Sequence, residues 1–136
     1  CPTRFFLESV SRFTPTYGYY YTHEPSWIDY YPSLEGWGAY HGSELNFVFG
    51  TNLEYLTSEE QQMSEKIRDI WISHAKGLDM TDYLGWNKFQ EMNYTQFEEE
   101  NWLEIKTGDF EVISDVHNER CNFFFEQFFL KLQILL

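Results

Sequence analysis

Apolar positions recur at helical spacing in three stretches of this chain. In residues 2–13 the repeat is carried mainly by phenylalanines. Pro2 suits the first turn of a helix there, and Pro15 ends the pattern because proline disfavours helical backbone before it. The last stretch runs from Asn118 to about Lys131. We expect a helix in each of these two segments.

The middle stretch carries explicit start and stop signals. Thr57 and Glu60 stand in the Thr-x-x-Glu order of a capping box, in which Thr57 caps the helix and Glu60 reaches back to it. The helix should run to about Ala75, because Lys76-Gly77 supplies a basic last turn and a stop. Its apolar stripe is expected at Met63, Ile67, Ile70, Trp71 and His74.

Two segments have the composition of strands. Residues 16–22 are crowded with tyrosines, and their lack of clean alternation suits burial on both faces. Residues 102–106 alternate apolar and polar positions and lead into a turn at Thr107-Gly108-Asp109. Three helices and two or three strands cover one edge of a sheet without closing a fold. We therefore expect an α/β chain that is part of a larger architecture.

The remaining segments are predicted to be mostly irregular. Residues 24–42 hold two prolines and three glycines, and an ordered loop of this length is usually functional or a lid. Residues 44–49 fit one short helical turn that Gly50 ends. Residues 79–101 should be mostly irregular, with three aromatic anchors at Trp86, Phe89 and Phe97.

Composition narrows the class of partner. Of the 136 residues, 43% are hydrophobic and 21% aromatic, which is enough to bury a core, and many aromatics are expected to pack against a body outside this chain. The formal net charge is -13, and a negative field of this size repels phosphate backbones, so nucleic acid is a poor partner and none is expected. The same charge either draws cationic ligands toward a cleft or simply forms a solvated acidic surface that aids the solubility of the protein.

The ends of the chain carry two further expectations. The apolar tail at residues 123–130 is interrupted and far shorter than the roughly 20 residues of a spanning helix, so no membrane span is expected. The sequence begins with Cys1-Pro2, has no signal peptide and lacks an initiator methionine, so we expect it to have been cleaved, trimmed or taken from the middle of a longer polypeptide.

Two features favour an oxidising, secreted setting. The chain has two cysteines, Cys1 and Cys121, and an even count fits one disulfide, with two separate buried thiols as the alternative. Asn93-Tyr94-Thr95 matches the acceptor pattern for N-glycosylation at Asn93.

Among four histidines, His41 is the candidate for chemistry. Gly38 and Gly42 flank it, and such glycines let the backbone turn sharply and hold an imidazole out into a cleft. This presentation suits a general base whose tautomer is set by a carboxylate. The other histidines, His23, His74 and His117, are expected to have structural roles.

Other chemistries fit less well. Glu44 could share a metal with His41, but no third ligand has suitable spacing, so no metal and no cofactor is expected. Ser43 lies too close along the chain to serve as the nucleophile of His41. Neither cysteine has the basic surroundings of a catalytic thiolate, apart from Arg120 beside Cys121.

The segment from Tyr40 to Gly50 resembles the histidine block of the type-B carboxylesterase/cholinesterase family, which reads His-Gly-x-Glu, a short apolar stretch and Phe-Gly. His41 matches the base of that family's Ser–His–Glu/Asp triad. The resemblance continues in order through the chain, in the segments at Cys1-Pro2, residues 16–23, 57–76, 86–89 and 120–132. It covers nearly all of this chain and about the last quarter of the family's length.

The resemblance implies the C-terminal portion of one α/β-hydrolase domain over residues 1–136. It also implies a Cys1–Cys121 disulfide, since the family bridges the matching positions. The family's Gly-Glu-Ser-Ala-Gly elbow, oxyanion glycines and acid are absent from these residues and would lie N-terminal to Cys1. Ser43 stands where cholinesterases often have an aromatic residue, and Gly77-Leu78-Asp79 replaces the usual Gly-Asn-Pro.

These likenesses imply a secreted serine ester hydrolase that acts on a small-molecule ester. His41 would be its base, and a companion N-terminal portion would supply the serine and the acid. Glu44 is expected either beside the site or as an acid favoured by a helix N-terminus. Trp37, Tyr40 and Phe49 would line the pocket or fill the core. The alternative is a non-catalytic relative used in adhesion, storage or scaffolding.

Overall fold

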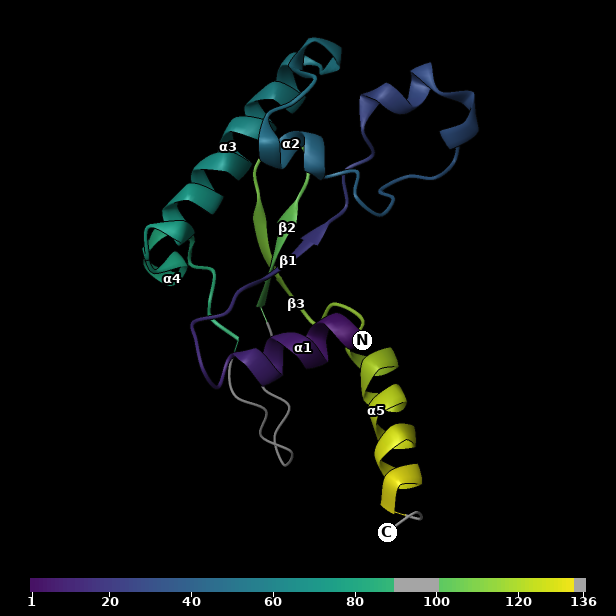
Figure 1. Ribbon diagram of the computed structural model, residues 1–136, viewed down its shortest axis with the longest axis vertical. Coiled ribbons are helices and arrows are strands. Elements are labelled where there is room, and N and C mark those ends of the chain that lie inside the picture. The colour runs from purple at the N-terminus through teal and green to yellow at the C-terminus, as the bar shows by residue number, and fades with distance from the viewer. Residues whose placement is uncertain (90–100, 134–136) are drawn as a thin grey trace.

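The computed structural model describes residues 1–89 and 101–133 (Figure 1). Within them the chain is a mixed α/β unit built on one small sheet. Its α-helices and strands are α1 (Pro2–Val10), β1 (Gly18–Tyr21), α2 (Leu45–Phe49), α3 (Ser58–Ala75), α4 (Met80–Leu84), β2 (Asn101–Ile105), β3 (Glu111–Ser114) and α5 (Asn118–Gln133). The connections of this described part include short 3-10 helices at Ser26–Tyr30, Pro32–Leu34 and Leu53–Tyr55.

The sheet has the strand order β1-β2-β3. β1 and β2 run parallel, with Tyr19 opposite Leu103, whereas β2 and β3 run antiparallel, with Trp102 opposite Ile113. Both faces of β2 are covered, because Trp102, Leu103 and Ile105 are all buried. The outer edge of β1 pairs with no strand from the described residues.

The two strands expected from composition are therefore present, each shifted or shortened by a residue or two. The four-residue strand β3 was not assigned from the sequence. Its four side chains are mostly exposed, so it lacks the apolar repeat that marks a buried strand.

Gly18 marks the closest approach between the sheet and the side chains that cover it. A Cβ atom at this position would lie 2.5 Å from the Phe89 ring and 2.9 Å from the Trp102 ring, so only glycine fits. The indole N–H of Trp86 donates to the Gly18 carbonyl at 3.0 Å. Trp86 and Phe89 are thus confirmed as buried anchors, whereas Phe97 lies outside the described residues.

The segment after α3 is more regular than expected, because α4 begins directly after Asp79. The Asp79 carboxylate caps this helix by accepting from the backbone N–H of Thr81 at 2.9 Å, and it also accepts from the Tyr17 hydroxyl at 3.0 Å. Lys88 forms an ion pair with the same carboxylate. Five helical residues are too few to show a repeat, which is why the sequence pattern missed them.

Helix α3 begins with the predicted capping box. The backbone N–H of Glu60 donates to the Thr57 hydroxyl, and the Thr57 N–H donates to the Glu60 carboxylate. Met63, Ile67 and Ile70 form the buried face of the helix, as predicted. The predicted stripe was too wide, since Trp71 is half-buried and His74 is exposed at the last turn.

Helix α1 is shorter than predicted and buries a different face. It ends at Val10, and the Ser11 hydroxyl donates to the Glu8 carbonyl at 2.8 Å, a side-chain bond that competes with further helix. The buried residues are Arg4 and Glu8, which form an ion pair at 2.9 Å. The phenylalanines that carry the apolar repeat, Phe5, Phe6 and Phe13, are exposed on this chain.

Helices α1 and α5 are joined near the start of each (Figure 1). Cys1 and Cys121 form a disulfide with their Cα atoms 4.9 Å apart. The Arg4 guanidinium adds hydrogen bonds to the side-chain oxygens of Asn118 at 3.2 Å and Asn122 at 3.0 Å. None of the helices in the described part of the chain has the length and hydropathy of a bilayer-spanning segment.

Candidate active site

His41 is held at the tip of a tight turn just before α2. The Tyr40 carbonyl accepts two hydrogen bonds from Ser43, one from its backbone N–H at 3.1 Å and one from its hydroxyl at 2.7 Å. Gly42 has a φ of 84°, a left-handed conformation that residues other than glycine rarely adopt. The His41 side chain is exposed and has no hydrogen-bond or ion-pair partner among the residues that the structure describes. The turn therefore presents the imidazole outward.

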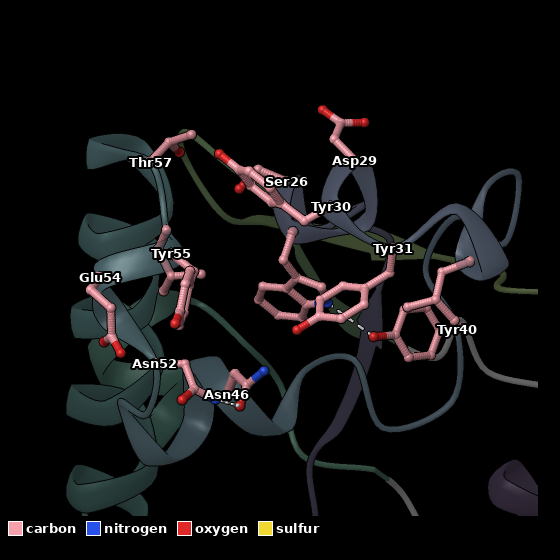
Figure 2. A pocket seen from close by; sticks show the side chains of 13 residues that line it. Ser26, Asp29, Tyr30, Tyr31, Tyr40, Asn46, Asn52, Glu54, Tyr55 and Thr57 are labelled. Carbon is pink, nitrogen blue, oxygen red and sulfur yellow. Dashed lines mark hydrogen bonds between the residues drawn. The ribbon is translucent and has the colours of Figure 1, made fainter.

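Tyr40 fixes this turn to the interior of the chain. Its hydroxyl accepts a hydrogen bond from the indole N–H of Trp27 at 3.0 Å, drawn in Figure 2 as the dashed line that ends at the Tyr40 hydroxyl. Trp27 is only 7% exposed and stacks on the fully buried Phe47 ring, with centroids 5.1 Å apart. The residue next to His41 is thus anchored through two aromatic side chains to α2.

A hollow of about 880 Å³ lies beside this anchor. In Figure 2, Asn52 and Tyr55 stand on one side of it, and Tyr31 and Tyr40 stand on the other. Asp29 belongs to the rim, where its carboxylate points away from the hollow. Among the described residues that line the hollow, five are aromatic and none is Lys, Arg or His.

Of the three predicted pocket residues, Tyr40 lines this hollow. Trp37 is 58% exposed and meets the Tyr40 ring edge-on at 5.7 Å between centroids. Phe49, at the end of α2, is 70% exposed. Neither side chain fills the core of this chain, and their role as pocket residues stays a prediction.

Glu60 is the most heavily hydrogen-bonded carboxylate in the described residues, and it is 2% exposed. Its Oε1 accepts from His23 Nε2 at 2.9 Å and from the Ser26 backbone N–H at 2.7 Å. Its Oε2 accepts from the Ser26 hydroxyl at 2.5 Å and from the Thr57 N–H at 2.8 Å. One carboxylate therefore ties the start of α3 to the segment that leaves β1.

This network keeps Glu60 ionised. Burial alone would raise its pKa, but the hydrogen bonds from the side chain and backbone of Ser26, from His23 and from Thr57 outweigh burial and lower the pKa to about 2. An ionised carboxylate only accepts hydrogen bonds, so Nε2 of His23 carries the proton that it shares with Glu60. His23 thus has the structural role expected of it.

Glu44 lies three residues after His41, at the N-cap position of α2, but its side chain makes no capping hydrogen bond. Burial, followed by the nearby Glu44 carboxylate, raises the pKa of the Tyr19 hydroxyl. The Glu44 side chain therefore lies near β1. Its role beside the catalytic site stays a prediction.

The other candidate residues also have defined positions. Ser43 is 2% exposed and its hydroxyl is used in the turn, which agrees with its exclusion as a nucleophile. Asn93, the predicted glycosylation site, lies outside the described residues. Among the described residues, no three His, Cys, Asp or Glu side chains gather as a metal site would require.

The sequence missed how far Glu60 reaches. The capping box predicts its bonds to Thr57, but its bonds to His23 and Ser26 span 37 and 34 residues along the chain. No local pattern reports such pairs. The only signal that the sequence offers is the acid itself, Glu60, three positions after the helix cap at Thr57.

Two kinds of comparison connect this arrangement with known proteins. The model of the carboxylesterase family matches residues 1–124. A human protein named cocaine esterase is 38% identical over 68 residues, which cover 46% of this chain and 12% of that protein. Acetylcholinesterase 1 of Caenorhabditis elegans is 35% identical over 85 residues, 60% of this chain and again 12% of that protein.

The matched part of the chain thus spans about an eighth of the length of these relatives. The family match reaches from α1 into α5 and includes β1, β2 and the turn that holds His41. On this evidence the chain belongs to the carboxylesterase family.

Proposed function

We propose that this chain supplies the catalytic base, His41, of a serine carboxylic ester hydrolase. The observation that carries the proposal is the turn at residues 40–43, which holds an exposed imidazole and gives it no partner from the described residues. An imidazole presented in this way is available to a hydroxyl and a carboxylate from another part of the polypeptide. The match to the carboxylesterase family makes ester hydrolysis the reaction that this geometry supports best.

In the proposed reaction, a serine from the preceding part of the domain attacks the ester carbonyl while His41 takes the serine proton. The tetrahedral intermediate collapses, and the leaving alcohol takes that proton from His41. Water then attacks the acyl-enzyme while His41 takes the water proton, and His41 returns that proton to the serine oxygen as the acyl–oxygen bond breaks and the carboxylic acid product leaves. A carboxylate from the preceding part orients the imidazole, and backbone N–H groups there stabilise the oxyanion.

The preceding part of an α/β-hydrolase domain would also complete the fold. β1 has an outer edge that no described strand occupies, and native proteins normally pair or cover the unpaired N–H and C=O groups of such an edge. Phe6, Phe13 and Phe123 are 63%, 87% and 65% exposed, which is a large apolar surface for a chain of this size. We propose that these surfaces pack against the companion N-terminal portion.

We also propose that the protein is secreted. A disulfide persists in an oxidising compartment, and the Asn93-Tyr94-Thr95 pattern is used only in the secretory pathway.

The test uses the full-length protein that contains this chain. His41→Gln should lower kcat on a p-nitrophenyl ester by about four orders of magnitude or more, with the fold retained. His74→Gln replaces another exposed histidine and should keep wild-type activity. A fluorophosphonate probe should label the wild-type serine.

Wild-type activity in His41→Gln would overturn the proposed role of His41. A wild-type protein that neither hydrolyses esters nor labels would instead support the non-catalytic alternative of adhesion, storage or scaffolding.

A further inference from the structure

We propose that Glu60 is a positioning residue for His41, acting through Ser26, Trp27 and Tyr40. This inference rests on the proposed catalytic role of His41. Glu60 lies 19 positions after His41 in the sequence, and it bonds to His23 and Ser26, which precede His41. It therefore ties the start of α3 to the beginning of the loop of residues 24–42, at whose other end His41 lies.

The first step of the connection is the start of the loop. β1 ends at Tyr21, and the chain then passes the Glu60 carboxylate twice, at His23 and at Ser26. Ser26 donates to both carboxylate oxygens, with its backbone N–H at 2.7 Å and its hydroxyl at 2.5 Å. Two bonds from one residue fix its orientation as well as its position.

The second step runs from Ser26 to the turn. Trp27 follows directly, and its indole donates to the Tyr40 hydroxyl at 3.0 Å. The Tyr40 carbonyl then accepts both hydrogen bonds that close the turn around His41. Every link is a hydrogen bond or a peptide bond between buried or half-buried residues, so a shift at Ser26 is carried to the imidazole.

The Glu60 carboxylate is suited to this positioning role because it is buried and ionised. Glu60 is 2% exposed, and its donors come from three separate segments: the residues just after β1, the first 3-10 helix and the cap of α3. Hydrogen bonds to an ionised group are shorter and stronger than those between neutral groups. A neutral amide in its place can accept at only one atom, and its NH₂ group would face the donors of Ser26 and Thr57.

Catalytic geometry tolerates little displacement. A misplacement of about 1 Å far from the reacting atoms can cost about a hundredfold in rate. Glu60→Gln in the full-length protein should therefore lower kcat by about tenfold or more, with KM nearly unchanged. The pH at which kcat/KM rises should also shift, because the imidazole no longer meets its partners in the wild-type geometry.

Three matched variants separate positioning from stability. Glu59→Gln makes the same change on an exposed neighbour and should keep the wild-type kcat. Thr57→Ala removes the helix cap and one 3.1 Å hydroxyl bond to Glu60 Oε2, but it keeps the Thr57 N–H bond and both Ser26 bonds. It should therefore lower the melting temperature and reduce kcat far less than Glu60→Gln does. Ser26→Ala removes the 2.5 Å bond without touching the capping box, and it replaces Glu60→Gln if that variant does not fold.

A double-mutant cycle tests the path itself. Trp27→Phe removes the donor to Tyr40, so Trp27→Phe and Glu60→Gln should together cost less than the product of their separate losses. Losses that multiply fully would show that Glu60 does not act through Trp27.

Hydrogen exchange supplies a readout that does not depend on activity. In Glu60→Gln the amide of Ser43 should exchange faster than in Thr57→Ala, because its bond to the Tyr40 carbonyl loses support. Equal exchange, or an equal loss of kcat in Thr57→Ala and Glu60→Gln, would overturn the inference. A wild-type protein without esterase activity would contradict the proposed function. The hydrogen-exchange comparison would still decide whether Glu60 holds the turn around His41.

Discussion

The hydroxyl of Ser64 donates a hydrogen bond to the backbone carbonyl of Phe47 at 2.8 Å, and both residues are fully buried. Phe47 belongs to α2 and Ser64 to α3. A five-residue helix has little stability of its own, so this bond and the packing of the Phe47 ring hold α2 in place directly after the His41 turn.

We expect Ser64→Ala to lower the free energy of unfolding by about 1–3 kcal/mol, because the Phe47 carbonyl would stay buried without a donor. Ser58→Ala makes the same change on the exposed first turn of α3 and should cost much less. Urea denaturation of the full-length variants measures both. Equal costs would mean that the Ser64 bond adds nothing beyond a generic serine in this helix.

Glu60 should give the protein an acid-dependent stability. Its pKa of about 2 in the folded state lies below the ordinary value of 4.5, so the folded state binds fewer protons than the unfolded state between these values. The stabilisation is fully present above about pH 4.5 and is lost as the pH falls toward 2. We expect wild type and Glu60→Gln to differ most near neutral pH and to converge in acid, as followed by denaturant titrations. A gap that stays constant with pH would contradict this explanation.

Reduction of the disulfide should destabilise the chain strongly. Cys1 and Cys121 are 120 positions apart, and the chain-entropy model gives about 4–5 kcal/mol for closing a loop of this length. Unreduced, denatured protein should contain no free thiol from this pair. Cys1→Ser with Cys121→Ser should unfold like the reduced wild type and should not respond to reductant. Free thiols at both Cys1 and Cys121 in the unreduced wild type would rule out the disulfide between them.

Asn93 provides a test of secretion. If the full-length protein passes through the secretory pathway, the tryptic peptide with Asn93-Tyr94-Thr95 should carry a glycan, which an amidase removes with conversion of Asn93 to aspartate. Asn93→Gln should abolish the mass shift, and Asn101→Gln, outside any such pattern, should leave it. An unmodified wild-type peptide from secreted material would contradict the prediction.

The sequence predicts those parts of the fold that depend on neighbouring residues. The capping box at Thr57 and Glu60 needs a separation of three positions, and Gly50 ends α2 with a φ of 61° as a helix-stopping glycine should. Both signals are local, and both appear in the structure. The resemblance also led to the pairing of Cys1 with Cys121 across nearly the whole chain.

What the sequence could not predict depends on distant contacts. The phenylalanines of α1 follow a helical repeat, yet Arg4 and Glu8 form its buried face because Arg4 bonds to Asn118 and Asn122 of α5. A repeat shows which residues share a face and leaves open what that face meets. The site has the same limit, since the flanking glycines predict an exposed His41 but no pattern links Glu60 to Ser26.

The bridge between the first residue and α5 has a consequence for any protease that cuts the exposed loop before His41. Both fragments would remain covalently attached, so the clipped molecule would migrate as one band on a non-reducing gel and separate into two only after reductant is added. Without reductant, the cut would be revealed by the intact mass, which rises by the mass of one water molecule.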